Sequence, residues 1–291
     1  MTVLEHLICP IDKRPLMVEA NGLVCAAGHA FDRAKTGYVN LLPVQKKRSK
    51  DPGDSKEMVA ARKAFLELGH YQAIVDKVVA ALQSRLPQEN QAEKPSLSLF
   101  DAGCGEGYYL NYLHQGLLSS VNRLDCVGLD ISKSAIVAAS KRNKNIAWIV
   151  ASNANIPTES VRFDSVRCLF GFPMFTEFAR VLKPKGLMLM VDANADHLIE
   201  LRRILYPEIH VYEDSLAAGI AGFSLVEEQA LNFSFELASQ QEIADLLAMT
   251  PHRHKASFEG RAAIQQINHL RLTADVKLRW YQKQIVEDAD V

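Results

Sequence analysis

The sequence has few cysteines, no excess of one charge and no long apolar run. Its 291 residues include 5 cysteines, and Cys104, Cys126 and Cys168 lie in or beside apolar stretches typical of buried strands and turns. We therefore expect no disulfide framework and a reducing, cytoplasmic location. No stretch of about 18 apolar residues occurs, and residues 1–9 lack a basic segment followed by an apolar one. Neither secretion nor membrane insertion is expected.

The charge is nearly balanced, with a net value of -1. The whole molecule therefore supplies no attractive field for nucleic acid, and any affinity for nucleic acid must come from local basic patches. The best local patch is the basic run at residues 46–50, in which Lys46, Lys47, Arg48 and Lys50 are candidate phosphate contacts. Such a run is also common on solvated surfaces.

The chain divides into three parts by composition. Residues 1–45 carry short apolar pieces separated by proline and glycine, which is typical of a small β-rich module. This module is too small to hold a core of its own, so it needs a metal or must pack on its neighbour. Residues 46–96 are predicted to form a linker and two helices, the first after Ser55 and the second before Pro87. Residues 97–291 form the main domain.

Strands and helices alternate in the main domain. Strands are predicted at residues 97–102, 124–130, 146–151, 163–170 and 187–191. Alternation with helices implies parallel strands joined by helical crossovers, so we predict an α/β fold with a doubly wound, mostly parallel sheet. Beyond residue 222 the pattern weakens: two strands are expected within 223–237, a helix at 240–247, and a helix or strand near the end.

A glycine-rich turn follows the first of these strands, in the sequence Asp101-Ala-Gly-Cys-Gly-Glu-Gly107. Gly103, Gly105 and Gly107 let a ligand approach the backbone, and the following helix offers free N–H groups. Their spacing, G-x-G-x-G, departs from the dinucleotide fingerprint G-x-G-x-x-G. Asp101 would repel a pyrophosphate but suits a ligand with an amino acid moiety and a sulfonium. The turn therefore favours S-adenosylmethionine.

Polar residues follow the next two strands. Asp130 stands where a doubly wound fold places its acceptor for ribose hydroxyls, although it could instead cap the helix that begins near Ser132. Ser152 and Asn153 follow the third strand and would flank the adenine ring. Agreement among strand, turn spacing and acidic strand ends predicts an S-adenosylmethionine-dependent methyltransferase rather than a nicotinamide enzyme.

Four residues of the N-terminal module (residues 1–45) have the spacing of a metal site. Cys9 and Asp12 form one pair, and Cys25 and His29 form a second pair. Thiolate or imidazole usually fills structural zinc sites, although a carboxylate can also ligate zinc. Zinc binding and a module held by packing alone both stay open at this point.

Three segments resemble the bacterial 23S ribosomal RNA guanine-N1 methyltransferases. They are Phe31-Asp-Arg-Ala-Lys-Thr-Gly-Tyr-Val-Asn-Leu-Leu-Pro-Val-Gln45, Lys47-Arg-Ser-Lys-Asp-Pro-Gly-Asp-Ser55 and Ala64-Phe-Leu-Glu-Leu-Gly-His-Tyr71. The resemblance continues through the glycine-rich turn and fades after about residue 225. It implies methylation of N1 of a guanine in a 23S RNA hairpin, at nucleotide 745 in one branch and 748 in another; we expect 745.

The same resemblance implies a class I methyltransferase fold and an N-terminal zinc-ribbon-like module that grips RNA. It also implies that Tyr71, Gly105, Glu106 and His197 contact the cofactor. The second cysteine ligand of the family is replaced here by Asp12, which puts the zinc in question but not the enzyme.

The reaction sets the demands on the remaining residues. Guanine N1 carries a hydrogen, so a carboxylate or neutral histidine would be useful as a base. Asp192, Glu106 and His197 are candidates, none of them singled out by spacing, and water could also accept the proton. Phe170 and Phe172 could stack on a guanine taken out of its helix, or could be core residues at a strand end.

Two other functions fit part of the sequence. One is a methyltransferase acting on a small metabolite, with the N-terminal module as a lid. The other is a catalytically silent RNA-binding protein of the same fold, which the intact turn and the acidic strand ends argue against. The sequence leaves open whether the chain forms a homodimer.

Overall fold

An eight-stranded sheet forms the centre of the computed structural model, which describes residues 3–43, 45, 51–86, 94–209, 213–214 and 216–285. The strand order is β10-β11-β9-β8-β5-β6-β7-β4. The strands are β4 (Val39–Asn40), β5 (Ser96–Ala102), β6 (Arg123–Asp130), β7 (Ala147–Val150), β8 (Phe163–Leu169), β9 (Leu182–Ala193), β10 (Phe223–Leu237) and β11 (Leu270–Lys283). From β4 to β9 they are parallel, and β11 and β10 follow antiparallel. The predicted doubly wound, mostly parallel α/β fold is confirmed.

The order of the parallel strands reverses between β5 and β8. From β5 the chain first moves through β6 to β7, and then returns to β8 and β9 on the other side. In open α/β sheets, ligands bind beyond the carboxyl ends of the strands at such a switch point. The glycine-rich turn leaves β5 at this place. The topology therefore puts the predicted cofactor site where the fold favours one.

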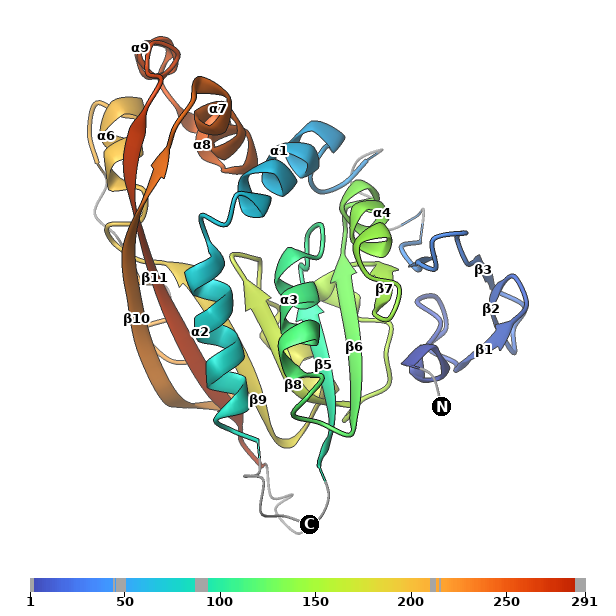
Figure 1. Ribbon diagram of the computed structural model, residues 1–291. Coiled ribbons are helices and arrows are strands. Elements are labelled where there is room, and N and C mark those ends of the chain that lie inside the picture. The colour runs from blue at the N-terminus through green and yellow to red at the C-terminus, as the bar shows by residue number, and fades with distance from the viewer. Residues whose placement is uncertain are drawn as a thin grey trace.

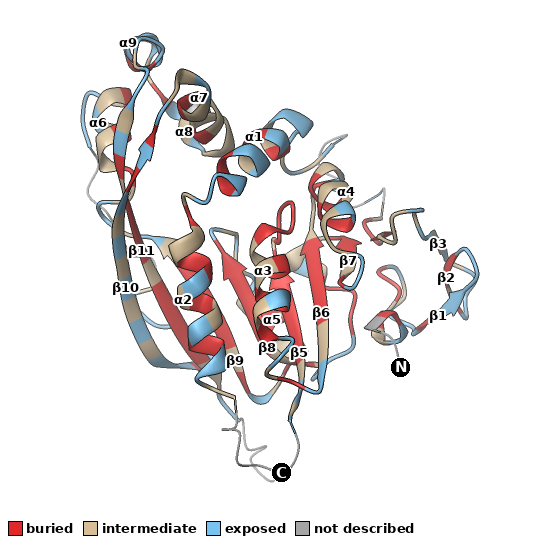
Figure 2. Cartoon of the chain, viewed as in Figure 1, coloured by how far each residue is buried: buried red, intermediate tan, exposed pale blue. Residues whose placement is uncertain are grey.

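Helices pack on the sheet and gather beyond the carboxyl ends of its strands (Figure 1). They are α1 (Lys56–Glu67), α2 (Gln72–Gln83), α3 (Tyr108–Leu117), α4 (Lys133–Arg142), α5 (Phe175–Val181), α6 (Ile199–Leu205), α7 (Gln240–Met249), α8 (His252–Lys255) and α9 (Phe258–Ile264). Figure 1 shows α1, α7, α8 and α9 beyond those ends. One apolar core lies between the sheet and helices α2 and α3, and a second lies on the face of α5. Figure 2 shows the result: buried central strands, and helices with one buried face.

The N-terminal module shares the second core. It contains the 3-10 helix η1 (Val3–His6) and an antiparallel sheet of β1 (Leu16–Glu19), β2 (Gly22–Cys25) and β3 (Ala30–Asp32). Its Leu7 and Leu23 are buried in the same cluster as Phe100 of β5 and Ile149 of β7. The module then continues into β4, which extends the central sheet beside β7. Packing on the neighbour thus replaces a core that the module is too small to form.

The C-terminal part is more regular than its sequence pattern suggests. The expectation of two strands within residues 223–237 is wrong, because β10 is one strand that pairs along its length with β11. A register shift between Leu225 and Glu227 absorbs the break in the pattern. Helices α8 and α9 were not predicted. None of the helices in the described part of the chain is long and apolar enough to span a membrane.

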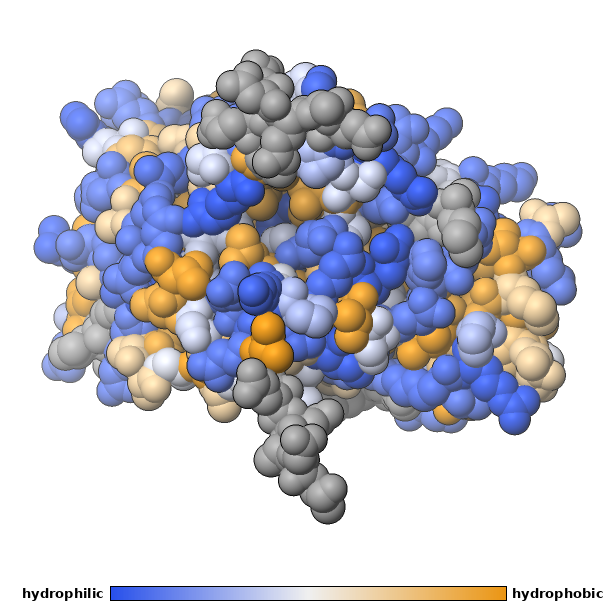
Figure 3. Space-filling view, turned by 90° about the horizontal axis from the view of Figure 1, so that it is seen from below, coloured by the Kyte–Doolittle hydropathy of each residue, from blue (hydrophilic) through white to orange (hydrophobic). Residues whose placement is uncertain are grey.

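The opposite end of the sheet, where the parallel strands begin, is mostly hydrophilic (Figure 3). A shallow cleft of about 250 Å³ lies there, lined by His6, Ser96, Leu97, Ser98, Arg123, Asp125, Arg162, Asp164 and Lys183. Its basic and acidic side chains pair with one another, as Arg162 does with Asp125 and Lys183 with Asp164. The charged side chains that line this cleft are therefore paired with neighbouring charges.

Candidate active site and metal centre

The glycine-rich turn between β5 and α3 has a left-handed backbone at all three glycines, with φ of 85° at Gly103, 56° at Gly105 and 83° at Gly107. A Cβ atom at Gly107 would lie 2.7 Å from Cη2 of Trp148, so this glycine is required for packing. A Cβ atom at Gly103 would meet only the side chain of Asn153, at 3.9 Å. Gly103 therefore faces open space on the side where a ligand would lie.

Two carboxylates stand at the carboxyl ends of the adjacent strands β5 and β6. Asp130 accepts a hydrogen bond from the Gly105 N–H at 3.0 Å and another from the Ser132 N–H at 2.7 Å. Asp130 therefore ties the turn to the start of α4 and is more than a helix cap. Asp101 is buried, and burial raises its pKa to about 6 against the opposing effect of Arg167. Burial also raises the pKa of Asp130.

The segment that precedes β5 in sequence lies close to this turn. Arg62 of α1 forms an ion pair with Asp54, whose carbonyl accepts a hydrogen bond from the Ser132 hydroxyl at 2.7 Å. A Cβ atom at Gly105 would lie 3.7 Å from Nη1 of Arg62. Residues 51–67 therefore pack against the turn from the side of the carboxyl ends, where α1 is seen in Figure 1.

Glu106 is buried within the turn and pairs with an arginine. Arg142 of α4 approaches its Oε2 at 2.7 Å through Nη2 and at 3.0 Å through Nε, while Oε1 is buried without a partner among the described residues. Burial raises the pKa of Glu106, and Arg142 counteracts that rise. Arg142 could not be found from the sequence pattern, because only the fold brings α4 over the turn.

Tyr71 and His197 meet in an aromatic cluster. The Tyr71 hydroxyl lies 3.1 Å from His197 Nε2, and His197 Nδ1 accepts the main-chain N–H of Asp275 at 3.2 Å. Burial lowers the pKa of His197 to about 4, so the ring is neutral near pH 7. Because Nδ1 is the acceptor, Nε2 carries the hydrogen and donates it to Tyr71. The Tyr71 hydroxyl can therefore donate its own hydrogen to a ligand.

Phe170 completes this cluster at the end of β8. Its ring centre lies 6.1 Å from that of Tyr71, 6.4 Å from that of Tyr109 and 6.0 Å from that of His197. Its backbone is left-handed, with φ of 52°, and 39% of the residue is exposed. Phe172 is 90% exposed. Left-handed backbone is costly for a bulky residue, and such strain is concentrated at functional sites.

The loop after β7 lies against both the turn and the end of β8. Ser152 caps the 3-10 helix η3 (Asn153–Asn155) by accepting the N–H of Ala154 at 3.2 Å. Asn153 donates from Nδ2 to the carbonyl of Phe172 at 3.2 Å. Its Oδ1 is buried without a partner among the described residues. The Asn153 side chain, whose Nδ2 lies beside the open face of Gly103, thus keeps an acceptor oxygen that the described residues leave without a partner.

The three candidates for a base differ in their surroundings. Both nitrogens of His197 are engaged, and Glu106 is paired with Arg142. Asp192 follows Val191 on β9 and so points to the other face of the sheet from the one on which Val191 joins the core that contains Tyr71. These surroundings favour none of the three as a base.

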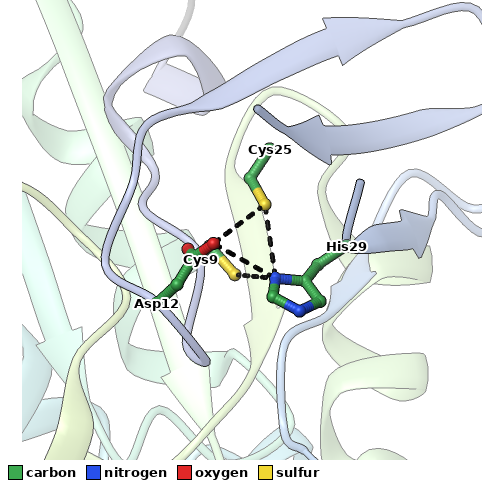
Figure 4. A group of neighbouring side chains, drawn as sticks. All are labelled: Cys9, Asp12, Cys25 and His29. Atoms are coloured by element: carbon green, nitrogen blue, oxygen red, sulfur yellow. Dashed lines mark hydrogen bonds and ion pairs between the residues drawn. The ribbon is translucent and has the colours of Figure 1, made fainter. Parts of the chain in front are cut away.

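The four predicted metal ligands of the N-terminal module converge (Figure 4). Their ligand atoms all lie within 4.8 Å of one another. His29 Nδ1 lies 3.5 Å from Cys9 Sγ, 3.4 Å from Cys25 Sγ and 3.2 Å from Asp12 Oδ2. Two thiols, one imidazole and one carboxylate offer the donor types and the number that a tetrahedral zinc ion requires.

The candidate metal ligands are linked to the loop after β7. Lys13, next to Asp12, hydrogen-bonds Asn155, and the Ile8 N–H donates to the Pro157 carbonyl at 3.0 Å. The metal site and the loop beside the glycine-rich turn are therefore parts of one packed unit. The predicted RNA contacts Lys46, Lys47, Arg48 and Lys50 lie outside the described residues.

Two family profiles match the chain. The profile described as "RlmA, N-terminal" matches residues 7–50, and the one described as "Methyltransferase domain" matches residues 99–186. The Bacillus subtilis protein YxjB, assigned by its name to the 23S rRNA (guanine-N(1)-)-methyltransferases, is 30% identical over 276 residues, which are 93% of this chain and 94% of YxjB. The Streptomyces fradiae 23S rRNA (guanine(748)-N(1))-methyltransferase is 30% identical over 200 residues, covering 68% of this chain and 67% of that protein.

Proposed function

Because the chain belongs to the family of 23S rRNA (guanine-N1-)-methyltransferases, we propose that it transfers a methyl group from S-adenosylmethionine to N1 of a guanine in a 23S rRNA hairpin. The observation that carries the proposal is the set of polar and aromatic groups at the switch point of the sheet. Nucleotide 745 stays our prediction for the target; the Streptomyces fradiae relative is named for nucleotide 748.

The residues around the glycine-rich turn fit S-adenosylmethionine. We assign Asp101 and the donor hydrogen of the Tyr71 hydroxyl to its amino acid moiety, and the Asp130 carboxylate to its ribose hydroxyls. The buried, unpartnered Oδ1 of Asn153 suits the adenine amino group, with Ser152 beside it. The turn residues Gly103, Gly105, Glu106 and Gly107 shape the pocket, and His197 orients Tyr71. S-adenosylmethionine supplies an electrophilic methyl group when it is bound.

The protein contributes mainly by positioning. Alignment of the guanine N1 with the methyl carbon and the sulfur is worth several orders of magnitude in rate. Phe170, partly exposed beside Tyr71 and Tyr109, offers a stacking surface for a guanine taken out of its helix, and exposed Phe172 extends that surface. Since the surroundings favour no protein base, the N1 proton leaves to water.

We assign zinc to the cluster of Cys9, Asp12, Cys25 and His29. Zinc binding would stabilise the N-terminal module. Through the hydrogen bonds of Lys13 and Ile8 it would also stabilise the conformation of the loop after β7. Metal analysis should find about one zinc per chain in the wild type and little in Asp12→Ala. Asp12→Cys should keep zinc more tightly, because it completes a set with three thiolates. A wild type without zinc contradicts the assignment.

The methylation itself is tested with labelled S-adenosylmethionine and 23S RNA that lacks the modification. We expect label at N1 of one hairpin guanine, located by mapping the modified base. Gly103→Ala probes the ligand side of the turn: its methyl group meets no protein atom closer than 3.9 Å but adds strain at φ of 85°, so it should weaken cofactor binding at a modest cost in stability. Label on metabolites but not on RNA would identify a small-molecule methyltransferase, and no label at all would identify a silent RNA-binding protein.

A further inference from the structure

Arg167 of β8 is a fully buried arginine whose charge the mechanism above does not use. Its exposed fraction is 0%, and Nε, Nη1 and Nη2 all lack a hydrogen-bond partner among the residues that the structure describes. Burying a cation without full pairing costs several kcal/mol, and well-packed apolar residues often replace buried ion pairs without loss of stability. A structural role alone therefore gives no reason for an arginine at this position.

The register of the sheet places Arg167 beside Asp101. The two residues are paired on the neighbouring strands β8 and β5, so their side chains leave the same face of the sheet. The guanidinium has no hydrogen-bond contact with the carboxylate. Arg167 therefore acts on Asp101 through its charge, and it leaves the lone pairs of the carboxylate free to accept a ligand.

The other titratable groups around Asp101 do not supply a positive charge. Asp130 on β6 is negative and opposes ionisation of Asp101. Cys104 in the turn, Cys126 on β6 and Cys168 on β8 also interact with Asp101, and burial raises the pKa of each thiol, so they are neutral. Of these described neighbours, Arg167 alone is a cation.

We propose that Arg167 is a positioning residue for the cofactor: its buried positive charge keeps Asp101 ionised, so that this carboxylate can accept the amino group of S-adenosylmethionine. The inference rests on the cofactor site proposed above. A protonated Asp101 would be neutral and would offer an ammonium group much weaker attraction. Arg167 thus acts on the cofactor through Asp101 and not by direct contact.

The test measures binding of S-adenosylhomocysteine to the full chain by calorimetry between pH 5.5 and 8.5. In the wild type, affinity should fall as the pH drops below about 6, where Asp101 takes up a proton. Arg167→Met should move this fall to higher pH and raise Kd about tenfold at pH 7, as expected when the pKa of Asp101 rises above 7 by about one unit. Arg167→Lys keeps a cation and should stay close to the wild type.

Arg162→Met is the matched control, since Arg162 lies in the cleft at the other end of the sheet and pairs with Asp125. It should keep the wild-type pH profile. In turnover assays, Arg167→Met should raise KM for S-adenosylmethionine while kcat at saturation changes little. A merely structural defect would lower the fraction of active protein at every pH and leave the pH midpoint in place, which would overturn the inference.

A double-mutant cycle with Asp101→Asn isolates the effect of the Arg167 charge on the carboxylate, and Arg167→Gln takes the place of Arg167→Met in the cycle if Arg167→Met does not fold. Arg167→Met should change the affinity of an Asp101→Asn background by no more than about twofold, because the charge has no carboxylate left to act on. If Arg167→Met lowers the affinity for S-adenosylhomocysteine equally with Asp101 and with Asn at position 101, the inference is overturned. A wild type that binds no S-adenosylhomocysteine would overturn the proposed cofactor site itself, whereas normal binding with an unchanged Arg167→Met profile overturns only the role of Arg167.

Discussion

Asp101→Asn should stabilise the ligand-free protein while weakening cofactor binding. Asp101 is 2% exposed, and burial raises its pKa from the ordinary value of 3.8 to about 6. One pKa unit corresponds to about 1.4 kcal/mol, so ionised Asp101 lowers the stability of the ligand-free fold by about 3 kcal/mol at pH 7. Asparagine has similar size and no charge, so this destabilisation should disappear in the variant.

The pH dependence gives this prediction its sign. Between about pH 4 and pH 6 the folded protein holds a proton on Asp101 that the unfolded chain has lost, so stability falls as the pH rises through this window. Well above pH 6 this loss of folding stability is complete. The advantage of Asp101→Asn should therefore be full at pH 7 and should vanish toward pH 4.

Thermal unfolding of the ligand-free protein at several pH values provides the assay. About 3 kcal/mol should raise Tm of a chain of this size by roughly 5 to 10 °C at pH 7. Asp125→Asn is the control, because Asp125 lies at the other end of the sheet and pairs with Arg162. A variant that is less stable than the wild type at pH 7, or whose gain is equal at pH 5 and pH 8, would refute the reasoning. The Kd of the Asp101→Asn variant for the cofactor should rise at least about tenfold at pH 7.

Three further predictions concern single residues of the site. Gly107→Ala should unfold the protein at a much lower temperature than Gly103→Ala, because its Cβ would lie 2.7 Å from Trp148; equal melting temperatures would contradict the assignment of Gly103 to the ligand side. His197, whose pKa is lowered to about 4, should cause stability to fall as the pH drops from about 6.5 to 4, and His197→Gln should remove this component of the pH profile of unfolding. Phe172→Ala should leave Tm and cofactor affinity unchanged, because the residue is 90% exposed, yet lower methyl transfer to RNA about tenfold or more; unchanged activity would exclude stacking by Phe172.

The convergence of the four candidate metal ligands could be predicted because its signal is local. The spacing of Cys9, Asp12, Cys25 and His29 predicted a cluster, and the structure brings their ligand atoms within 4.8 Å. The strand that ends at Asp101 and the glycines that follow also form a continuous segment, whose backbone conformation depends on nearby residues.

The resemblance to a known family added what spacing could not. It pointed to Tyr71 and His197, which are 126 positions apart in the chain and lie in hydrogen-bond contact in the fold. No periodicity relates two such positions. The tautomer of His197 could not be predicted at all, because it depends on a main-chain N–H of β11, 78 positions away, that only the tertiary structure brings to the ring.

The sequence by itself determined the alternation of strands and helices, the G-x-G-x-G turn and the spacing of the metal ligands, since each depends on residues close together in the chain. Only the tertiary structure decided which residues surround these features. It placed β4 at the edge of the central sheet, made residues 223–237 one strand, and set Arg167 beside Asp101. Strand order and register depend on packing between distant segments, and the local pattern of a strand does not specify its neighbour.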